Sequence, residues 1–427
     1  MFHKKLNELP KEMSSFIHMA GALADEKGIN AYVVGGFVRD IFLGVKNFDV
    51  DLVVEGDGIA FASECARNQS LKLVTHKRFG TATIHGLHGF KVDIASARRE
   101  IYEEPAALPV VFKGHIRDDL FRRDFTVNAM AISINKHCFG QIIDHYDGHS
   151  DLKTGVIRAL HVNSFIDDPT RIMRAVRFEQ RFDFKIDKET LSWIKSSLRR
   201  KMLHQVQKHR LRDELILIFK ERSPVRSLRR LWGLAGFSYI ALGLRFHKGW
   251  HKSFEDVAKK ARWFDEHFSH KRHLEPYVMY MSLFFSTLTH KELCQVMRDF
   301  AFHKGESSRI ISFRENFARV EKELSKKSVR ASTVYRILEP LSYEVVLLSA
   351  ALSSCELVVK RVQDFLFVYN GQRIHVKGDD LKGLGVKPGP HFKKILDELL
   401  YAKIDAEVSN KEEELVLAQR KIKEHMK

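Results

Sequence analysis

The stretch YVVGGFVRDIFLGVKNFDVDLVVE, residues 32–55, carries the side chains best suited to chemistry. Asp49 and Asp51 lie two positions apart in a β-rich run, so both carboxylates leave the same face of a strand. The residues that alternate with them face the other way: Phe48, Val50 and Leu52. Two neighbouring carboxylates repel each other unless a cation lies between them, and Mg²⁺ prefers hard oxygen ligands. The pair predicts a Mg²⁺ site, although an Asp-x-Asp motif also occurs at solvated strand ends.

A glycine turn precedes these acids. Gly35 and Gly36 follow an apolar run and begin a helical stretch that contains Arg39. Glycine lets the backbone approach an anion closely, and a helix N-terminus supplies free N–H groups. The order of turn, helix and Asp-x-Asp strand predicts a nucleoside triphosphate site beside a metal-bound reaction centre. Asp93, on a later β-rich run, is a candidate third carboxylate, although taken alone it fits a surface strand end better.

A second dense motif is FRRDFTVNAMAISI, residues 121–134, with Arg123, Asp124 and Asn128. Arginine grips phosphate in a bidentate fork, and aspartate or asparagine can hold ribose hydroxyls. The motif therefore predicts further nucleotide contacts. The structural alternative is a basic helix start that leads into a core strand.

A third motif, DDPTRIMRAVRF, places Asp168 and Arg171 three residues apart at a predicted helix start, where they can face the same way. Pro169 fits the first helical position and Asp168 an N-cap, so capping is the alternative role. A carboxylate accepts hydrogen bonds and a guanidinium donates them. Cytosine and adenine present an amine beside an unprotonated ring nitrogen, whereas uracil and guanine present a carbonyl beside a ring N–H. The pair could accept C and A and reject U and G without a template.

The elements that must position these motifs change in character near residue 165. Before it, helical and short β-rich patterns alternate, which indicates a small α/β unit. Residues 96–120 hold two prolines and little periodicity and predict a long loop, of the kind that forms a lid. After residue 165 the pattern is largely helical. The expected helices before it are 1–30 and 59–70, and the expected strands 71–74, 81–84 and 90–94; in the tail a helix is expected over 391–402.

The 427 residues carry a net charge of +17 and a pI near 9.6, which favours a polyanionic partner, with nucleic acid ahead of a membrane surface. Evenly spread Lys and Arg are the alternative. Residues 195–230 are thick with both on a helical pattern, which suits phosphate contacts or a solvated face equally. No apolar run approaches the length of a membrane span, and the four cysteines form no CxxC pair. The start MFHKKLNELPKEM has no apolar core, so we expect no secretory signal. We expect a cytoplasmic protein with buried thiols.

In combination, VVGGFVRD…FDVDLVV, RRDFTVNAMAI and DDPTRIMRAVRFEQRF resemble the class II tRNA nucleotidyltransferases, relatives of bacterial poly(A) polymerases in the polymerase-beta-like superfamily. The tail, GDDLKGLGVKPGPHFKKILDELLYAKIDAEVSNKEEE, is also similar, so the resemblance covers nearly the whole chain. It implies an α+β fold. A catalytic head with a small mixed sheet spans 1–160, a helical neck with the nucleotide-recognition helix 161–230, a helical body 231–365 and a tRNA-binding tail 366–427.

The resemblance also implies roles for single residues. Asp49 and Asp51 match the metal-binding carboxylates, and Gly35 and Gly36 match the phosphate-binding turn. Asp93 stays a candidate catalytic acid because of its strand position. The other nucleotide-binding positions implied are Arg39, Arg123, Asp124, Asn128, Asp168, Arg171, Arg174 and Arg177. The tRNA-binding positions implied are Lys382, Lys387, Lys393 and Lys394. Asp167 and His209 stand where the family pattern often has Glu, so no role is given to His209.

The resemblance implies addition of CCA, or of its terminal A alone, to tRNA from CTP and ATP, with two Mg²⁺ ions and release of pyrophosphate. CC-only relatives tend to lack part of the loop that is intact here as SARREIYEEPAALPVV, which disfavours that activity. Poly(A) polymerases carry an Arg-Arg-Phe signature followed by an apolar-His-Val run, where this chain has HKRFGTATIHG, so that activity ranks lower. An inert tRNA-binding module is the remaining alternative, and the intact Asp pair argues against it. We expect no membrane partner and a monomer or homodimer.

Overall fold

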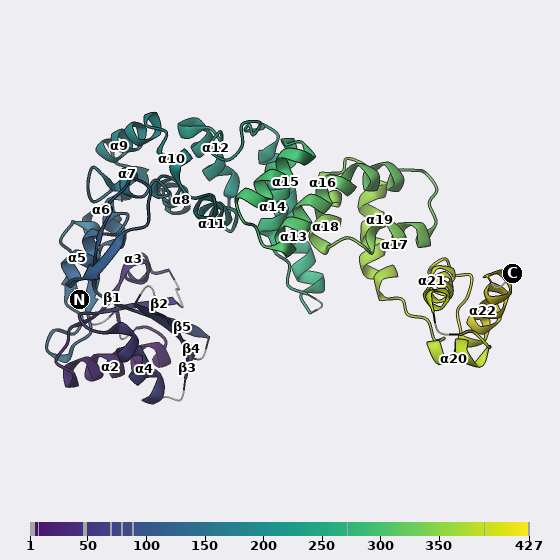
Figure 1. Cartoon of the computed structure of the whole chain (residues 1–427), viewed down its shortest axis with the longest axis horizontal. Coiled ribbons are helices and arrows are strands. Elements are labelled where there is room, and N and C mark those ends of the chain that lie inside the picture. The colour runs from purple at the N-terminus through teal and green to yellow at the C-terminus, as the bar shows by residue number, and fades with distance from the viewer. Residues whose placement is uncertain are drawn as a thin grey trace. The chain divides into compact units, whose positions relative to one another are not determined.

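The computed structural model describes residues 5–6, 8–45, 49–68, 71–77, 80–87, 89–270, 272–387 and 389–425 (Figure 1). The chain divides into two compact units. The first consists of residues 1–218 and 226–239, and the second of residues 219–225 and 240–427.

The first unit is built on a seven-stranded mixed sheet with the order β3-β4-β5-β2-β1-β8-β9. In it β2 runs parallel to β5, and the other neighbours are antiparallel. The strands are β1 Ala31–Val34, β2 Asp49–Val54, β3 Lys72–His76, β4 Thr81–Leu87, β5 Phe90–Ser96, β8 Ala131–Ser133 and β9 Ile142–Ile143. The three strands predicted between residues 71 and 94 are confirmed as β3, β4 and β5, each longer than predicted.

The period-two pattern of β2 sets the two faces of this sheet. Val50 and Leu52 are buried, as predicted, and Phe48 lies outside the described residues. On the face of Asp51, Val53 packs in one apolar cluster with Ile116 and Leu120. Two helices, α2 (Lys11–Glu26) and α4 (Gly58–Asn68), contact each other and the sheet and lie along it in Figure 1. The second helix confirms the prediction over 59–70, and α2 confirms residues 11–26 of the helix predicted over 1–30; residues 1–4, 7, 69 and 70 of these predictions lie outside the described residues.

The prediction of a long loop over residues 96–120 is wrong. The segment forms a hairpin of β6 (Arg98–Ile101) and β7 (Val110–Lys113), followed by α5 (Ile116–Phe121). Pro105 and Pro109 lie outside the paired residues, so neither removes an N–H group from the ladder.

Helices dominate the first unit after residue 160, as predicted, apart from a short parallel pair of β10 (Val156–Ile157) and β11 (Lys185–Ile186). The helix of the third motif, α8, begins at Arg171 rather than at Pro169, so Asp168 is not its N-cap. Instead Asp168 accepts hydrogen bonds from the backbone N–H and the hydroxyl of Thr170 in the turn before the helix. The helices not yet named are α3 Gly35–Leu43, α6 Gly148–Thr154, α7 Ser164–Asp167, α8 Arg171–Phe182, α9 Lys188–Arg199, α10 Met202–Gln205, α11 Lys208–Phe219 and α12 Pro224–Ala235.

The described part of the second unit is helical throughout. Its core is aromatic, with the rings of Phe254 and Tyr280 stacked at 5.1 Å between centroids. In the tail, the predicted helix over 391–402 is confirmed as α21. The helices are α13 Trp250–Phe268, α14 Pro276–Phe284, α15 His290–Asp299, α16 Lys304–Leu324, α17 Ala331–Leu338, α18 Tyr343–Leu352, α19 Glu356–Phe367, α20 Gly378–Gly383, α21 Pro390–Ile404 and α22 Lys411–His425.

Two expectations drawn from composition can be compared with this fold. Among the described residues, no helix is both long and apolar enough to cross a membrane. All four cysteines are free, but only Cys65 is buried, so the expectation of buried thiols holds for one of the four.

Candidate active site

The parallel pairing of β2 with β5 gathers the predicted carboxylates on one face of the sheet. Asp51 lies opposite Asp93, and Asp49 lies opposite Lys91. The Lys91 ammonium is 3.2 Å from Asp93 Oδ2 and 3.8 Å from Asp49 Oδ1. Asp93 also accepts a hydrogen bond of 2.5 Å from the hydroxyl of Thr83, its partner on β4. The strand register thus brings three acids and one lysine together.

These acids differ in environment. The side chain of Asp49 is 61% exposed, whereas Asp51 is half-buried. Burial raises the pKa of Asp51 to about 6; Arg123 opposes this rise, and the charges of Asp93 and Asp49 add to it. A bound cation stabilises carboxylates that lie close together and are partly desolvated, because it offsets their repulsion. Their hard oxygens suit a divalent metal. Within the described ranges, no three His, Cys, Asp or Glu side chains form a ready-made metal cluster. The donor set therefore fits a divalent cation that ligands outside the chain help to hold.

Gly35 has a specific steric role at the start of α3. Its φ is +69°, and a Cβ built there would lie 2.4 Å from Nη1 of Arg123 and 3.7 Å from Oδ2 of Asp51. Any larger residue would displace the guanidinium from beside the carboxylate. The close approach that the sequence predicts at this glycine is therefore to an arginine, whereas at Gly36 the nearest atom is 3.5 Å away, in Arg39.

A chain of buried polar contacts joins the second motif to three helices. Arg39 donates to Asn128 (2.6 Å), and Asn128 donates to Asp124 (2.9 Å). Asp124 in turn accepts two hydrogen bonds from Arg174 on α8, at 2.8 and 2.6 Å. Arg174 also contacts Glu214 on α11 at 3.2 Å. The chain links α3, the 126–128 turn, α8 and α11 into one frame.

The electrostatics of this frame centre on Asp124. Burial alone would raise its pKa, but the charge of Arg174 and the hydrogen bond from Asn128 outweigh burial and hold the pKa at about 2. The ring of Phe178 lies 5.3 Å from the Arg39 guanidinium and 5.5 Å from that of Arg174. Asp124 is thus a permanent anion at neutral pH. The ring of Phe178 helps to hold Arg39 and Arg174 in place.

The side chains of Asp168 and Arg171 bond to other groups, and the two residues contact each other through the backbone, where the N–H of Arg171 donates to the carbonyl of Asp168 at 3.1 Å. Oδ1 of Asp168 forms an ion pair of 2.8 Å with Arg210, and Nη2 of Arg171 donates to the backbone carbonyl of Arg122 at 2.7 Å. Among the described residues, the buried Nη1 of Arg171 has no hydrogen-bond partner. A buried donor with no acceptor is costly unless a ligand satisfies it.

Most predicted nucleotide-binding residues line one cavity of about 480 Å³ in the first unit. These are Gly36, Arg39, Arg123, Asp124, Asn128, Asp168, Arg171, Arg174 and Arg177, and the predicted metal ligand Asp51 lines the same cavity. Gly35, Asp49 and Asp93 lie beside this lining and not in it. The four tail lysines belong to the second unit, where all are exposed and Lys382 pairs with Asp379.

Several lining or supporting residues were not predicted. Glu100, on β6, pairs with Arg122, and it was missed because the hairpin was taken as a loop. Arg210 and Glu214 lie one turn apart on α11, in the stretch KHRLRDEL, and each contacts a predicted residue. Their spacing of four on a helical pattern was the available signal. The other unpredicted lining residues are Tyr102, Arg122, Phe178 and Arg181.

Comparison with known proteins places this site in a family. Residues 31–158 match the model described as the poly(A) polymerase head domain, and residues 183–244 the model described as the probable RNA and SrmB-binding site of polymerase A. The chain is 35% identical over 407 residues to an A-adding tRNA nucleotidyltransferase of Halalkalibacterium halodurans, covering 93% of this chain and 90% of that protein. The chain belongs to the tRNA nucleotidyltransferase family. The family implies use of a divalent metal.

Two further relatives of this tRNA nucleotidyltransferase family member bear on its length and fold. An A-adding tRNA nucleotidyltransferase of Geobacter sulfurreducens is 36% identical over 98% of this chain, but the chain spans only 48% of that protein. A Thermotoga maritima CCA-adding enzyme complexed with tRNA is 32% identical, with a TM-score of 0.73 over 99% of this chain and 98% of that one. These relatives confirm the family and the fold class, an α+β head followed by helices.

Proposed function

We propose that the chain is a template-independent tRNA nucleotidyltransferase that extends the tRNA 3′ end from CTP and ATP and releases pyrophosphate. The observation that carries this proposal is the single cavity that unites Asp51 with the residues of all three sequence motifs. It supports a triphosphate lying along the arginines, with its reacting phosphate near Asp51.

We infer that Mg²⁺ is the divalent metal. Asp49 and Asp51 would hold it, and Asp93 would keep its carboxylate in register through Thr83 and Lys91. Bound there, Mg²⁺ supplies activation of the tRNA 3′-hydroxyl and stabilisation of the leaving pyrophosphate. The side chains position the reactants: Arg123 beside Asp51 faces the phosphates, and the frame around Asp124 holds the ribose end of the site.

Base selection is assigned to Asp168 and Arg171. Nη1 of Arg171 has no hydrogen-bond partner in the described structure and can donate to an unprotonated ring nitrogen. Oδ2 of Asp168 remains to accept from an exocyclic amine, because Oδ1 is engaged by Thr170 and Arg210. C and A satisfy both groups, and U and G leave both unpaired.

Two products remain in competition. Addition of the terminal A alone is favoured by the two A-adding relatives that match over nearly this whole chain. Addition of all of CCA is supported by the CCA-adding enzyme whose structure matches along the whole chain. The chemistry of Asp168 and Arg171 fits both products.

The remaining assignments are part of the same proposal. The exposed lysines of the tail, Lys382, Lys387, Lys393 and Lys394, would contact tRNA phosphates. The parts are a head (1–160), neck (161–230), body (231–365) and tail (366–427), acting in the cytoplasm as a monomer or homodimer.

The test uses three tRNA substrates that end before CCA, after the first C and after the second C, each with CTP, ATP or both. We expect extension with Mg²⁺ present. Extension of the last substrate alone identifies an A-adding enzyme, and completion of all three identifies a CCA-adding enzyme. Long A tails on RNA other than tRNA would replace the proposal with a poly(A) polymerase, and tRNA binding without extension would leave an inert binding module.

A further inference from the structure

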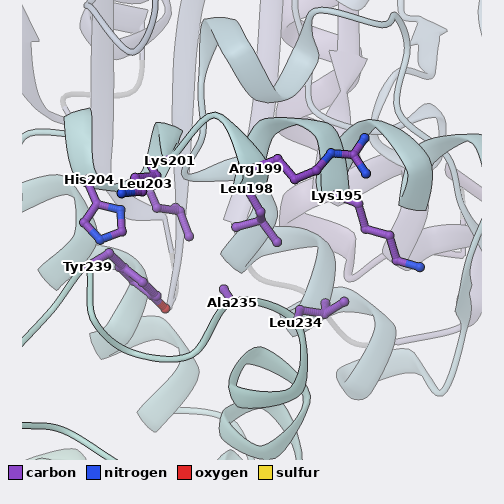
Figure 2. A pocket seen from close by; sticks show the side chains of 9 residues that line it. All are labelled: Lys195, Leu198, Arg199, Lys201, Leu203, His204, Leu234, Ala235 and Tyr239. Carbon is purple, nitrogen blue, oxygen red and sulfur yellow. The ribbon is translucent and has the colours of Figure 1, made fainter. Parts of the chain in front are cut away.

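A second cavity of the first unit, with a volume of about 390 Å³, lies apart from the site described above and shares no lining residue with it (Figure 2). It is an open pocket lined by residues of α9, α10 and the end of α12, and by Lys201 and Tyr239. Its size falls within the range of about 300–1,000 Å³ that is usual for ligand pockets. All its lining residues fall within residues 183–244, the segment that matches the probable RNA-binding model.

The first feature of this cavity is a hydroxyl without a partner. Tyr239 is 1% exposed, and its hydroxyl forms no hydrogen bond with the described residues. In Figure 2 its ring runs from beside His204 toward Ala235, with the hydroxyl at the Ala235 end. A buried tyrosine hydroxyl normally finds a partner, because leaving it unsatisfied costs about 1–3 kcal/mol. This hydroxyl therefore points to a ligand with a hydrogen-bonding edge.

The second feature is uncompensated positive charge. Lys195, Arg199 and Lys201 line the cavity, and in the described structure none of the three forms an ion pair. Lys195 and Arg199 are four residues apart on α9 and so share a face. His204 also lines the cavity, but burial and the neighbouring Lys208 lower its pKa, which leaves it mainly uncharged at neutral pH. No carboxylate is among the described lining residues, so the rim is suited to an anion.

The third feature is an apolar surface between the side chains of Lys195 and Arg199 and the tyrosine; Lys201 lies on the tyrosine side. In Figure 2, Leu198 and Ala235 lie between the Lys195 and Arg199 side chains on one side and Tyr239 on the other. A phosphate alone makes no use of such a surface, whereas the flat face of a nucleobase does.

We propose that this cavity binds one unpaired nucleotide of the RNA substrate, with its phosphate at Lys195 and Arg199, its base against Leu198 and Ala235, and a base edge at the Tyr239 hydroxyl. The inference rests on the proposed function in one respect, that tRNA is the partner. It adds a contact at a distance from the reacting end. Such a contact would secure the RNA without taking part in the choice of nucleoside triphosphate.

The test measures tRNA affinity by fluorescence anisotropy for the full chain and four variants. Arg199→Gln removes a charge from the cavity, and Arg200→Gln removes the same charge from the next, exposed residue, which does not line the cavity. Ala235→Trp fills the cavity without changing charge, and Tyr239→Phe removes only the hydroxyl. Free AMP and CMP are titrated in parallel, and circular dichroism confirms that each variant is folded.

We expect Arg199→Gln and Ala235→Trp each to weaken tRNA binding about tenfold, Tyr239→Phe about threefold and Arg200→Gln less than about twofold. Equal losses for Arg199→Gln and Arg200→Gln, with none for Ala235→Trp, would reduce the effect to diffuse electrostatics and overturn the proposal. Weaker AMP or CMP binding with unchanged tRNA binding would instead make this a site for a free nucleotide, which also overturns it.

The readout separates this proposal from the proposed function. If the chain binds tRNA but extends no end, the proposed function fails while the affinities of the variants still test the cavity. If extension proceeds and all four variants bind tRNA like the unmodified chain, the proposal for the cavity fails alone.

Discussion

The two cavities of the first unit differ in whether their basic side chains are paired with acids. At the candidate active site, arginines pair with acids: Arg174 in the cavity wall with Asp124 and Glu214, and the supporting Arg210 with the lining residue Asp168. In the second cavity, Lys195 and Arg199 line an apolar surface with no acid among the described lining residues. Internal pairing fixes side chains at defined positions, which suits recognition and transfer. Cationic side chains without an acidic partner are not held at defined positions until an anion binds, which suits a contact that adds affinity for the RNA backbone.

The largest effect on the candidate active site is expected from a substitution of Asp51. Asp51→Asn keeps the shape and removes the charge, so we expect turnover to fall roughly a thousandfold or more while tRNA affinity changes by less than about twofold. Single-turnover extension and anisotropy measure the two quantities. Asp93→Asn serves as the graded comparison, because Asp93 already has Thr83 and Lys91 as partners and its loss should cost less. Lost tRNA binding with normal turnover would contradict the role of Asp51.

The internally paired frame is tested by Arg174→Met. This change leaves the carboxylate of Asp124 buried without its strongest partner, and removing one member of a buried pair costs about 3–5 kcal/mol. We expect the free energy of unfolding, from urea titration, to fall by this amount and ATP affinity to fall with it. Arg226→Met is the control, since its partner Asp183 is exposed. An equal effect of the two variants would show that the frame adds no special stability.

Base selection gives a sharper test of positioning. Asp168→Asn replaces an acceptor with an amide that can also donate, so the site can pair with the carbonyl of G or U. We expect the ratio of ATP to GTP use, measured as relative kcat/KM, to fall roughly tenfold or more. Asp167→Asn is the matched control, because Asp167 is adjacent and does not line the cavity. Unchanged discrimination in Asp168→Asn would remove that residue from base selection.

The raised pKa of Asp51 predicts a pH dependence of metal binding. Burial raises the pKa of Asp51 in the folded state from 3.8 to about 6, so protonation of Asp51 favours the folded state. This contribution to the free energy of unfolding is complete below about pH 3.8 and is lost as the pH rises through about 6. A metal must displace this proton, so divalent affinity should fall by up to about tenfold per pH unit below about 6 and level off above it. Mn²⁺ titration followed by electron paramagnetic resonance measures this affinity. A flat profile would contradict the assigned ligand.

The smallest effect is expected at Lys91. Its ammonium lies beside Asp49 and Asp93 and competes with a divalent cation for them. Lys91→Met should therefore tighten Mn²⁺ binding a few-fold, about the size of a partly exposed charge interaction. Lys72→Met, on an exposed β3 position, is the control. Weaker metal binding in Lys91→Met would mean that the lysine orients the acids rather than competing for them.

Local spacing predicted much of this site. The period of two along β2 placed Asp49 and Asp51 on one face, and the GlyGly turn was correctly followed by a helix. The pairing of Asp51 with Asp93 depends on the crossover that sets β2 beside β5, which no local pattern encodes. Asp93 was therefore found as a candidate, but its place opposite Asp51 could not be derived.

The contacts that could not be predicted from the sequence are mostly between residues far apart in the chain. Arg210 is 42 positions after Asp168, and only the packing of α11 against the turn before α8 brings them to 2.8 Å. The hairpin of β6 and β7 was hidden because its two prolines suggested a loop, although both lie outside the ladder. That error also hid Glu100, whose side chain anchors Arg122 in the cavity wall.

The most direct test of the central claim is extension of tRNA that ends after the second C, by the unmodified chain, with each of the four nucleoside triphosphates. Acids that hold divalent metal beside a cavity selecting the base predict extension with ATP, none with GTP or UTP, and complete loss of extension in EDTA that Mg²⁺ restores. Extension that continues in EDTA, or equal use of all four nucleotides, would contradict the account.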